Sequence, residues 1–338
     1  MTAPAASNAL TPDPALVARF RADLAALCDP ERERVLLAVS GGADSTALLL
    51  LAHAALGGRC HAATVDHGLR PEAAGEAAAV ARLCATLGVA HATLAAPMPA
   101  RVRRTANLSA RARALRYRLL EDHARTIGAH RIATAHHADD QLETLIMRLN
   151  RGSGVTGLAG IRPAGGMTIR PLLGWRRAEL ATLVARAGIA AIEDPSNVDD
   201  RFDRARLRKV LADAGWLDAD QWRRSAAALG DAEAALEWAT RDVAQRCCML
   251  DGDRATLNVD DQPAELLRRL VLRCLVHVDP AADPRGSQVA RLTAAIAAAR
   301  ENGADLRATL GNVLIERVDD HASGVTIAFA PAPPRRSG

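Results

Sequence analysis

The sequence has almost no lysine and few aromatic residues. Lysine occurs once, at Lys209, so arginine supplies 42 of the 43 lysine and arginine residues. Aromatic residues make up only 2% of the 338 residues, with four Trp, one Tyr and three Phe. Because sequence-tolerant binders of single strands stack bases on aromatic side chains, this scarcity argues against extended base stacking. Any contact with nucleic acid must then depend mainly on shape and on phosphates.

Signals for secretion and for membrane insertion are also missing. The six cysteines contain no C-x-x-C pair, and the N-terminal segment has no basic stretch followed by an apolar one. The longest uncharged apolar run, residues 45–58, is shorter than the roughly 20 residues that a membrane helix needs. We therefore expect a soluble protein of the reducing cytoplasm, with no membrane partner.

Charge is unevenly distributed, although the net charge is only +4. Residues 101–200 carry 16 Arg against 10 acidic residues, whereas the segments on either side are balanced or slightly acidic. Such a basic segment suits a polyanion such as nucleic acid or nucleotide phosphate, and a solvated helix face explains it equally well.

Length and pattern predict two domains, of which the first has an α/β fold. Apolar runs alternate with helical periods through the first two hundred residues, as expected for a parallel sheet covered by helices. We expect a Rossmann-like parallel-sheet domain over residues 31–212. The expected strands are 34–40, 61–65, 90–94, 130–135 and 168–173, and the expected helices are 45–56, 72–87, 108–118, 139–150 and 177–187.

The pattern changes after residue 194. Long Ala-rich helical periods at 221–249 and 264–278 predict a smaller, mainly helical domain over residues 215–330, with a small hairpin within 307–330. Residues 1–30 are expected to be a flexible N-terminus with a leading helix. Residues 331–338 are expected to be a disordered tail.

The strongest chemical signal is the run Ser40-Gly41-Gly42-Ala43-Asp44-Ser45, which lies where the first strand ends and a helix begins. Two glycines permit close backbone approach, and amides and hydroxyls at the positive end of the helix form a cradle for phosphate. The Walker pattern is absent, because no lysine follows the glycines. A carboxylate beside phosphates needs a cation, so we interpret Asp44 as a magnesium ligand; a helix-capping Asp is the simpler alternative.

Acidic residues open a later helix, directly after another strand. Asp140 and Glu143 are three residues apart and share a face, and Asp139 precedes them. His137 comes just before this helix and could polarise a phosphate or donate a hydrogen bond to developing charge. Acids that only complement the helix N-terminus, and a structural histidine, are the alternatives.

Several further basic residues are candidates for contact with a nucleotide or with RNA. His67 and Arg70 follow the second strand and could line a nucleotide pocket, although a turn at Gly68 is the competing interpretation. Arg113 and Arg116 are three residues apart, and Arg204 and Arg208 four apart, so each pair could reach phosphate or RNA together; solvated faces are the alternative.

At this point the sequence resembles the PP-loop ATP pyrophosphatases, whose S-G-G-x-D-S loop holds the pyrophosphate of ATP. Further motifs resemble the tRNA(Ile)-lysidine synthetase family, and the resemblance covers roughly residues 34–210. These motifs are Val65 to Arg70, Ala112-Arg113 with Arg116-Tyr117, His137 to Thr144, Arg151 to Gly154, Arg170 to Leu173 and Glu193 to Asn197.

The resemblance implies that ATP and Mg²⁺ activate the wobble cytidine of a CAU-anticodon tRNA(Ile), and that free L-lysine then displaces AMP to give lysidine, which changes codon specificity from AUG to AUA. It implies catalytic roles for Asp44, His137 and Asp140, with Mg²⁺ on Asp44 and Asp140. The remaining implied contacts are ATP on Ser40, Gly41, Gly42, Ala43, Asp44, Ser45, His67 and Arg113, lysine on Asp139 or Glu143, and tRNA on Arg204, Arg208 and the second domain.

Two positions depart from the family pattern, since Ala205 follows Arg204 where the family usually has Asn, and Ser109 replaces a common Glu. Three other functions remain possible. A PP-loop tRNA thiolase would activate the base identically and deliver sulfur, but usually has paired cysteines near the site. An amide-forming synthetase would need an ammonia source, and a non-catalytic RNA-binding protein would not need an intact loop. The oligomeric state stays open, with a homodimer possible.

Overall fold

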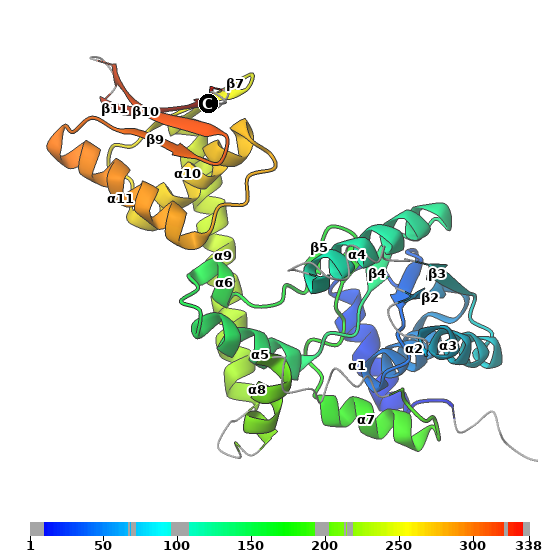
Figure 1. Ribbon diagram of the computed structural model, residues 1–338. Coiled ribbons are helices and arrows are strands. Elements are labelled where there is room, and N and C mark those ends of the chain that lie inside the picture. Colours follow the sequence, from blue (N-terminus) through cyan, green and yellow to red (C-terminus); the bar gives the residue numbers. More distant parts are fainter. Residues whose placement is uncertain are drawn as a thin grey trace, which may run out of the picture. The chain divides into compact units, whose positions relative to one another are not determined.

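The chain forms two compact units in the computed structural model, which describes residues 10–66, 68, 72–95, 108–192, 203–212, 214, 219–320 and 324–333 (Figure 1). Unit 1 comprises Met1–Gly152 and Gly157–Ala227, and unit 2 comprises Ser153–Thr156 and Ala228–Gly338. The division between Ala227 and Ala228 falls within helix α9 (Ala219–Cys247), beyond residue 215, where the second domain was expected to start.

Unit 1 is built on a six-stranded sheet with the order β3-β2-β1-β4-β6-β5. All neighbours are parallel except β5 and β6, which pair antiparallel. The α/β prediction is confirmed, although the last parallel strand is shorter than expected. The strands are β1 (Val35–Ala38), β2 (Cys60–Asp66), β3 (His91–Ala95), β4 (Arg131–Ala133), β5 (Ala164–Gly165) and β6 (Thr168–Ile169).

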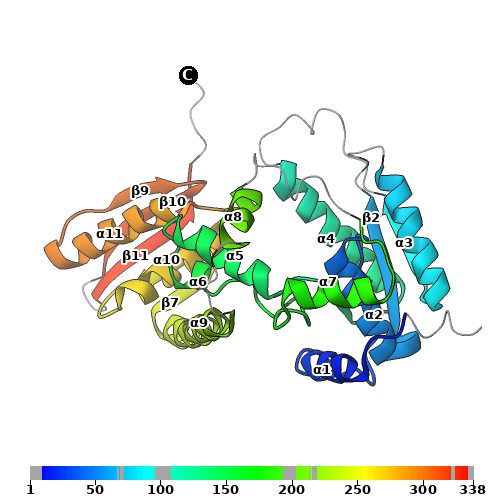
Figure 2. The same cartoon turned by 90° about the horizontal axis from the view of Figure 1, so that it is seen from below.

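Helices cover both faces of this sheet (Figure 1, Figure 2). Alternate strand residues point to opposite faces, so Leu36 and Ile132 pack against Leu120 of α4, whereas Val35 and Leu37 join the cluster that includes α1, α2 and α7. The unit's helices are α1 (Pro14–Ala25), α2 (Ala43–Leu56), η1 (Gly57–Arg59), α3 (Ala73–Leu87), α4 (Leu108–Thr126), α5 (Ala138–Leu149), α6 (Val155–Leu158, partly in unit 2), α7 (Arg177–Arg186), α8 (Asp203–Ala212) and the start of α9.

Unit 2 packs helices on an antiparallel sheet of five strands, in the order β7-β8-β11-β10-β9. Leu257, Ile315 and Phe329 of this sheet are fully buried with Leu270 and Ile296 of the helices. The hairpin expected near the C-terminus is therefore part of a larger sheet. The elements are the rest of α9, α10 (Ala264–Val278), α11 (Gly286–Asn302), β7 (Cys248–Asp251), β8 (Arg254–Asn258), β9 (Arg307–Leu310), β10 (Val313–Asp320) and β11 (Gly324–Pro331).

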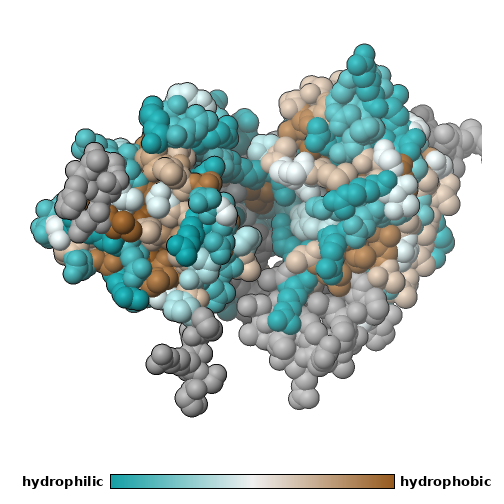
Figure 3. All heavy atoms as spheres, turned by 90° about the horizontal axis from the view of Figure 1, so that it is seen from above, coloured by the Kyte–Doolittle hydropathy of each residue, from teal (hydrophilic) through white to brown (hydrophobic). Residues whose placement is uncertain are grey.

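The face drawn in Figure 3 intersperses hydrophilic and hydrophobic residues over each unit. Among the described residues, no helix is both long enough and apolar enough to cross a membrane. A few large apolar side chains are nevertheless exposed, namely Leu149, Val210, Trp238, Met249, Leu250, Val276 and Val318.

Candidate active site

The glycine loop lies between the carboxyl end of β1 and the start of α2. The Ser45 hydroxyl donates to the Gly42 carbonyl at 3.0 Å and accepts from the Ser40 N–H at 3.2 Å, which ties both ends of the loop together. Thr46 donates through its hydroxyl to the Gly41 carbonyl at 3.3 Å. The hydroxyls that the sequence assigned to a phosphate cradle thus also hold the loop in shape.

Gly41 is the loop residue whose conformation excludes other side chains. Its φ is +89°, where L-residues are strained. A Cβ at this position would clash with the side chain of Ile192 and lie 3.1 Å from Val80 Cγ2. Its carbonyl accepts from the Ile192 N–H at 2.9 Å, so the loop is packed closely from behind.

The N-terminus of α2 is suited to an anion. Gly42 is the N-cap and offers no side-chain acceptor to the first-turn N–H groups. These groups carry the positive end of the helix dipole, which attracts phosphate. Asp44 lies in this first turn, and its Oδ1 atom is buried without a hydrogen-bond partner.

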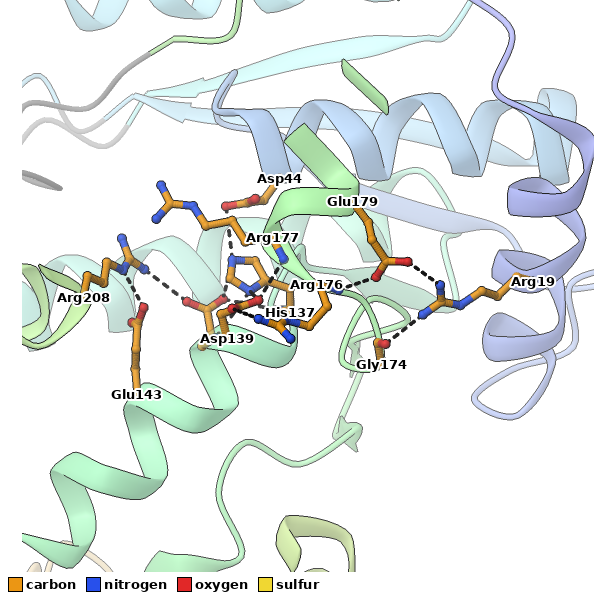
Figure 4. Close-up of polar contacts among 11 residues, drawn as sticks. Arg19, Asp44, His137, Asp139, Glu143, Gly174, Arg176, Arg177, Glu179 and Arg208 are labelled. Carbon is orange, nitrogen blue, oxygen red and sulfur yellow. Dashed lines mark hydrogen bonds and ion pairs between the residues drawn. The ribbon is translucent and has the colours of Figure 1, made fainter. Parts of the chain in front are cut away.

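His137 brings the loop and the acidic helix together (Figure 4). It is the N-cap of α5, its side chain is 1% exposed, and its Nδ1 accepts from the Asp140 N–H at 3.3 Å. An accepting Nδ1 leaves the proton on Nε2 in the neutral ring. The Nε2 atom lies 3.4 Å from Asp44 Oδ2 and 3.6 Å from Asp140 Oδ2, so it faces both carboxylates.

The carboxylates around this histidine raise the pKa of its imidazole. Burial by itself lowers the pKa of His137, but the contact with Asp44 and the charges of Asp140 and Asp139 outweigh it, so the pKa is raised above 6.5. The imidazole is therefore a proton donor directed at a cluster of negative charge.

Glu143 and Asp140 share a cationic partner, Arg208 of α8. Arg208 donates through Nε to Glu143 Oε1 at 2.5 Å and through Nη2 to Asp140 Oδ1 at 3.3 Å. The Glu143 side chain is 4% exposed, and its Oε2 atom is buried without a hydrogen-bond partner. Arg208 was expected to contact RNA; its guanidinium faces the acidic site, and RNA contact stays a prediction.

Asp139 points to the other side of the α5 N-terminus, toward the start of α7. Its Oδ2 accepts from the Arg177 N–H at 2.8 Å, and its Oδ1 lies 3.4 Å from Arg176 Nη2. These arginines were not singled out in the sequence. The only local signal for them is an Arg pair at the expected start of a helix, which also describes many solvated helix ends.

The remaining expected site residues are not joined to this cluster by any contact in the part of the chain that the structure describes. Arg113 is exposed on α4, where its guanidinium lies 5.0 Å from the ring centroid of Tyr117 and donates to its hydroxyl at 3.3 Å. Ala205 is buried at 3% exposure on α8. His67 and the side chains of Arg204 and Ser109 lie outside what the structure describes.

The arrangement can hold a triphosphate and a cation. Asp44 and Asp140 face one imidazole nitrogen, and Asp44 Oδ1 is a buried oxygen in need of a positive partner. No group of three or more His, Cys, Asp or Glu side chains among the described residues forms a metal site. Mg²⁺ commonly takes only one or two carboxylates and completes its shell with phosphates and water, so the donor set fits a nucleotide-bound magnesium.

Fold and site together define a PP-loop enzyme that uses ATP, and residues 16–214 match the family model described as a PP-loop domain. The tRNA(Ile)-lysidine synthases of Novosphingobium aromaticivorans and Rhodopseudomonas palustris are 46% and 41% identical to the chain. These alignments cover 83% and 89% of the chain, and 86% and 91% of the relatives. The chain belongs to the tRNA(Ile)-lysidine synthase family and is an enzyme of the ligase class.

A solved structure shows a similar fold at greater distance. The U34-tRNA thiolase NcsA from Methanococcus maripaludis, solved with its [4Fe-4S] cluster, is 16% identical and superposes with a TM-score of 0.54. The match covers 64% of the chain and 79% of the thiolase. At this identity the likeness concerns the fold alone.

Proposed function

We propose that the protein uses ATP and Mg²⁺ to join free L-lysine to C2 of the wobble cytidine of a CAU-anticodon tRNA(Ile), releasing pyrophosphate and AMP. The observation that carries this proposal is the convergence of Asp44 and Asp140 on His137 Nε2, beside the uncapped start of α2. Family membership supplies the substrates, since the relatives are named for this tRNA and for lysidine.

In the first step the cytosine C2 carbonyl oxygen attacks the α phosphorus of ATP, and the bond to pyrophosphate breaks. The first-turn amides of α2 and the hydroxyls of Ser40 and Ser45 would bind the pyrophosphate. Asp44 and Asp140 would hold Mg²⁺, which neutralises phosphate charge when bound. His137 would donate its Nε2 hydrogen toward the same charge. The base must leave the anticodon stack to reach this loop.

In the second step the lysine amine, as the free base, attacks C2. AMP leaves with the former carbonyl oxygen, and the proton lost from the nitrogen of the new C–N bond passes to water. An incoming ammonium needs a carboxylate, and Glu143 is the better candidate of the two that the sequence proposes. Its Oε2 is buried with no hydrogen-bond partner, whereas both oxygens of Asp139 already contact the start of α7. We therefore assign lysine binding to Glu143, and assign Asp139 to the support of the site.

tRNA contact is proposed for unit 2, for the basic segment of residues 101–200, and for Arg204 and Arg208. Unit 2 offers exposed arginines on α9 and β9, such as Arg246 and Arg307, whose side chains are 68% and 75% exposed. Phosphate contacts of this kind position an RNA without reading its sequence.

The alternative function is that of a tRNA thiolase, which would deliver sulfur to the base in place of lysine. The properties of Cys60 and Cys84 in unit 1 argue against this alternative. Burial raises the pKa of the Cys60 and Cys84 thiols to about 11. A thiol that stays protonated at neutral pH is a poor nucleophile. Both side chains are buried in the apolar cluster on one face of the sheet.

The test is the first half-reaction, performed without lysine. Purified protein, ATP and Mg²⁺ are incubated with a CAU-anticodon tRNA(Ile) transcript, and with a matched transcript whose wobble cytidine is replaced by uridine. We expect pyrophosphate release and an adenylated RNA with the first transcript only. Equal pyrophosphate release with both transcripts would overturn the proposed target.

A further inference from the structure

Helices α5 and α7 meet at their N-termini and satisfy each other's backbone groups. The Ala138 N–H at the start of α5 donates to the Trp175 carbonyl at 2.8 Å. In return, the Arg177 N–H at the start of α7 donates to Asp139 Oδ2 at 2.8 Å. First-turn N–H groups have no partner within their own helix, so this exchange fixes the loop from Gly174 to Arg177 against the acidic site.

Helix α1 holds the same loop from the opposite side (Figure 4). Trp175 is fully buried, and its Nε1–H donates to Asp23 Oδ2 at 2.8 Å. Arg19 lies 4.1 Å from the Trp175 ring centroid and donates to the Gly174 carbonyl and to Glu179, both at 2.8 Å. A continuous chain of contacts thus runs from α1 through Trp175 to Asp139.

The bond from Trp175 to Asp23 is expected to contribute more than the ion pair from Arg19 to Glu179. The indole is buried and its acceptor is a carboxylate oxygen, which makes this hydrogen bond strong and its loss costly. Arg19 and Glu179 are 39% and 40% exposed, and exposed ion pairs contribute little. Asp23 is therefore the position at which α1 acts on the loop.

We propose that Asp23 of α1 is a positioning residue of the active site, which acts through Trp175 to fix Asp139 and the start of α5. The expected effect of Asp23 on the reaction rate rests on the proposed function. Its expected effect on the loop of residues 174–177 does not. Because His137 and Asp140 belong to the same first turn of α5, a displaced turn would change the approach of His137 to Asp44. The predicted consequence is a slower chemical step with little change in ATP binding.

The first test measures amide hydrogen exchange by mass spectrometry, with no substrate present. In Asp23→Ala we expect faster exchange in peptides that cover residues 137–140 and 174–179. Asp23→Asn should restore protection, because the Asn oxygen can still accept from the indole. Arg21→Ala is the matched control, since Arg21 lies on the same helix but contacts Glu31 and the Ala55 carbonyl. Exchange that is equal in Asp23→Ala and Arg21→Ala would overturn the proposal.

The second test compares the rate of pyrophosphate release in the same three variants. Asp23→Ala should lower kcat about tenfold at an unchanged KM for ATP, as small misplacements of catalytic groups do. Asp23→Asn and Arg21→Ala should stay within about twofold of the unsubstituted enzyme. A kcat that is unchanged in Asp23→Ala would overturn the catalytic part. If no variant and no unsubstituted protein releases pyrophosphate, the proposed function fails, and the exchange experiment still decides the role of α1.

Discussion

His137 Nε2 lies 3.4 Å from Asp44 Oδ2, although one residue follows the first strand of the sheet and the other follows the fourth. The contact arises because β1 and β4 are adjacent and parallel, so their carboxyl ends open at the same edge. This contact joins the glycine loop to the N-terminus of α5.

Asp44→Asn tests whether the loop carboxylate serves chemistry or only supports the fold, because Gly42, and not Asp44, is the N-cap of α2. Asn is nearly isosteric, so the fold should be kept, while the loss of charge should lower pyrophosphate release at least about 100-fold. tRNA binding, measured by filter retention, should stay nearly intact. Equal loss of tRNA binding and of pyrophosphate release would mean that Asp44 has only a structural role.

His137→Asn separates the two roles of the histidine. Asn is a good N-cap, so α5 should stay capped, and His137→Ala should be about 1 kcal/mol less stable than His137→Asn in urea unfolding. Both variants lack the Nε2 hydrogen and should lose pyrophosphate release about equally. High activity in His137→Asn would show that capping is the whole contribution of this residue.

Glu143→Gln tests the proposed lysine contact. The Gln oxygen can still accept from Arg208, but a buried charge is lost, which should raise the KM for lysine about 10- to 100-fold. Pyrophosphate release without lysine should change little. Asp139→Asn is the comparison variant, because it can still accept from the Arg177 N–H. If the KM for lysine rises more in Asp139→Asn than in Glu143→Gln, Asp139 binds lysine and Glu143 supports the site.

Arg269→Met tests the buried ion pair of unit 2. Arg269 and Glu233 are 10% and 2% exposed, and Arg269 also donates to Thr156 at 3.0 Å. Removal of the arginine takes its cationic partner from the buried Glu233 carboxylate, which should lower the free energy of unfolding by about 3 kcal/mol. The exposed pair of Arg246 and Asp242 gives the control, since Arg246→Met should have little effect. Equal unfolding curves would contradict the buried-charge argument.

The pH dependence of stability should include a contribution from Glu265. The hydrogen bond from Arg268, together with Arg269, lowers the pKa of Glu265 below 4.5 in the folded protein. A lowered folded pKa means that the stabilisation is complete above about pH 4.5 and is lost as the pH falls through the folded pKa. Glu265→Gln should therefore reduce the loss of stability between neutral and acidic pH. Parallel pH profiles for both proteins would contradict this assignment.

Local sequence pattern predicted much of the fold. The period of apolar residues gave α10 with both its ends, and the apolar run after the glycines gave the buried helix α2 to within two residues of its start. The pattern missed α11 and the extent of the C-terminal sheet. The sheet is completed by the pairing of β8 with β11, which are far apart in the sequence, and short alternating segments do not show which strand they pair with.

The candidate site could be predicted where strand ends and motifs coincide, as for Asp44, His137 and Asp140. The part that could not be predicted depends on long-range contacts with no local signature. Nothing in the sequence around Trp175 indicates a role in the site. Its hydrogen bond to Asp23 joins residues 152 positions apart, so no local pattern could predict it. Arg208 has the spacing of a solvated or RNA-binding helix face, and its contact with Glu143 follows only from the packing of α8 on α5.

The most direct test of the account is the incorporation of labelled lysine into a CAU-anticodon tRNA(Ile) transcript, with ATP, Mg²⁺ and a parallel assay of AMP. We predict label at the wobble cytidine, one AMP for each lysine, and no incorporation with Asp44→Asn. RNA-dependent release of AMP without lysine at that cytidine would contradict the account. It would mean that a nucleophile other than lysine attacks the adenylated base, and a sulfur nucleophile would be tested first.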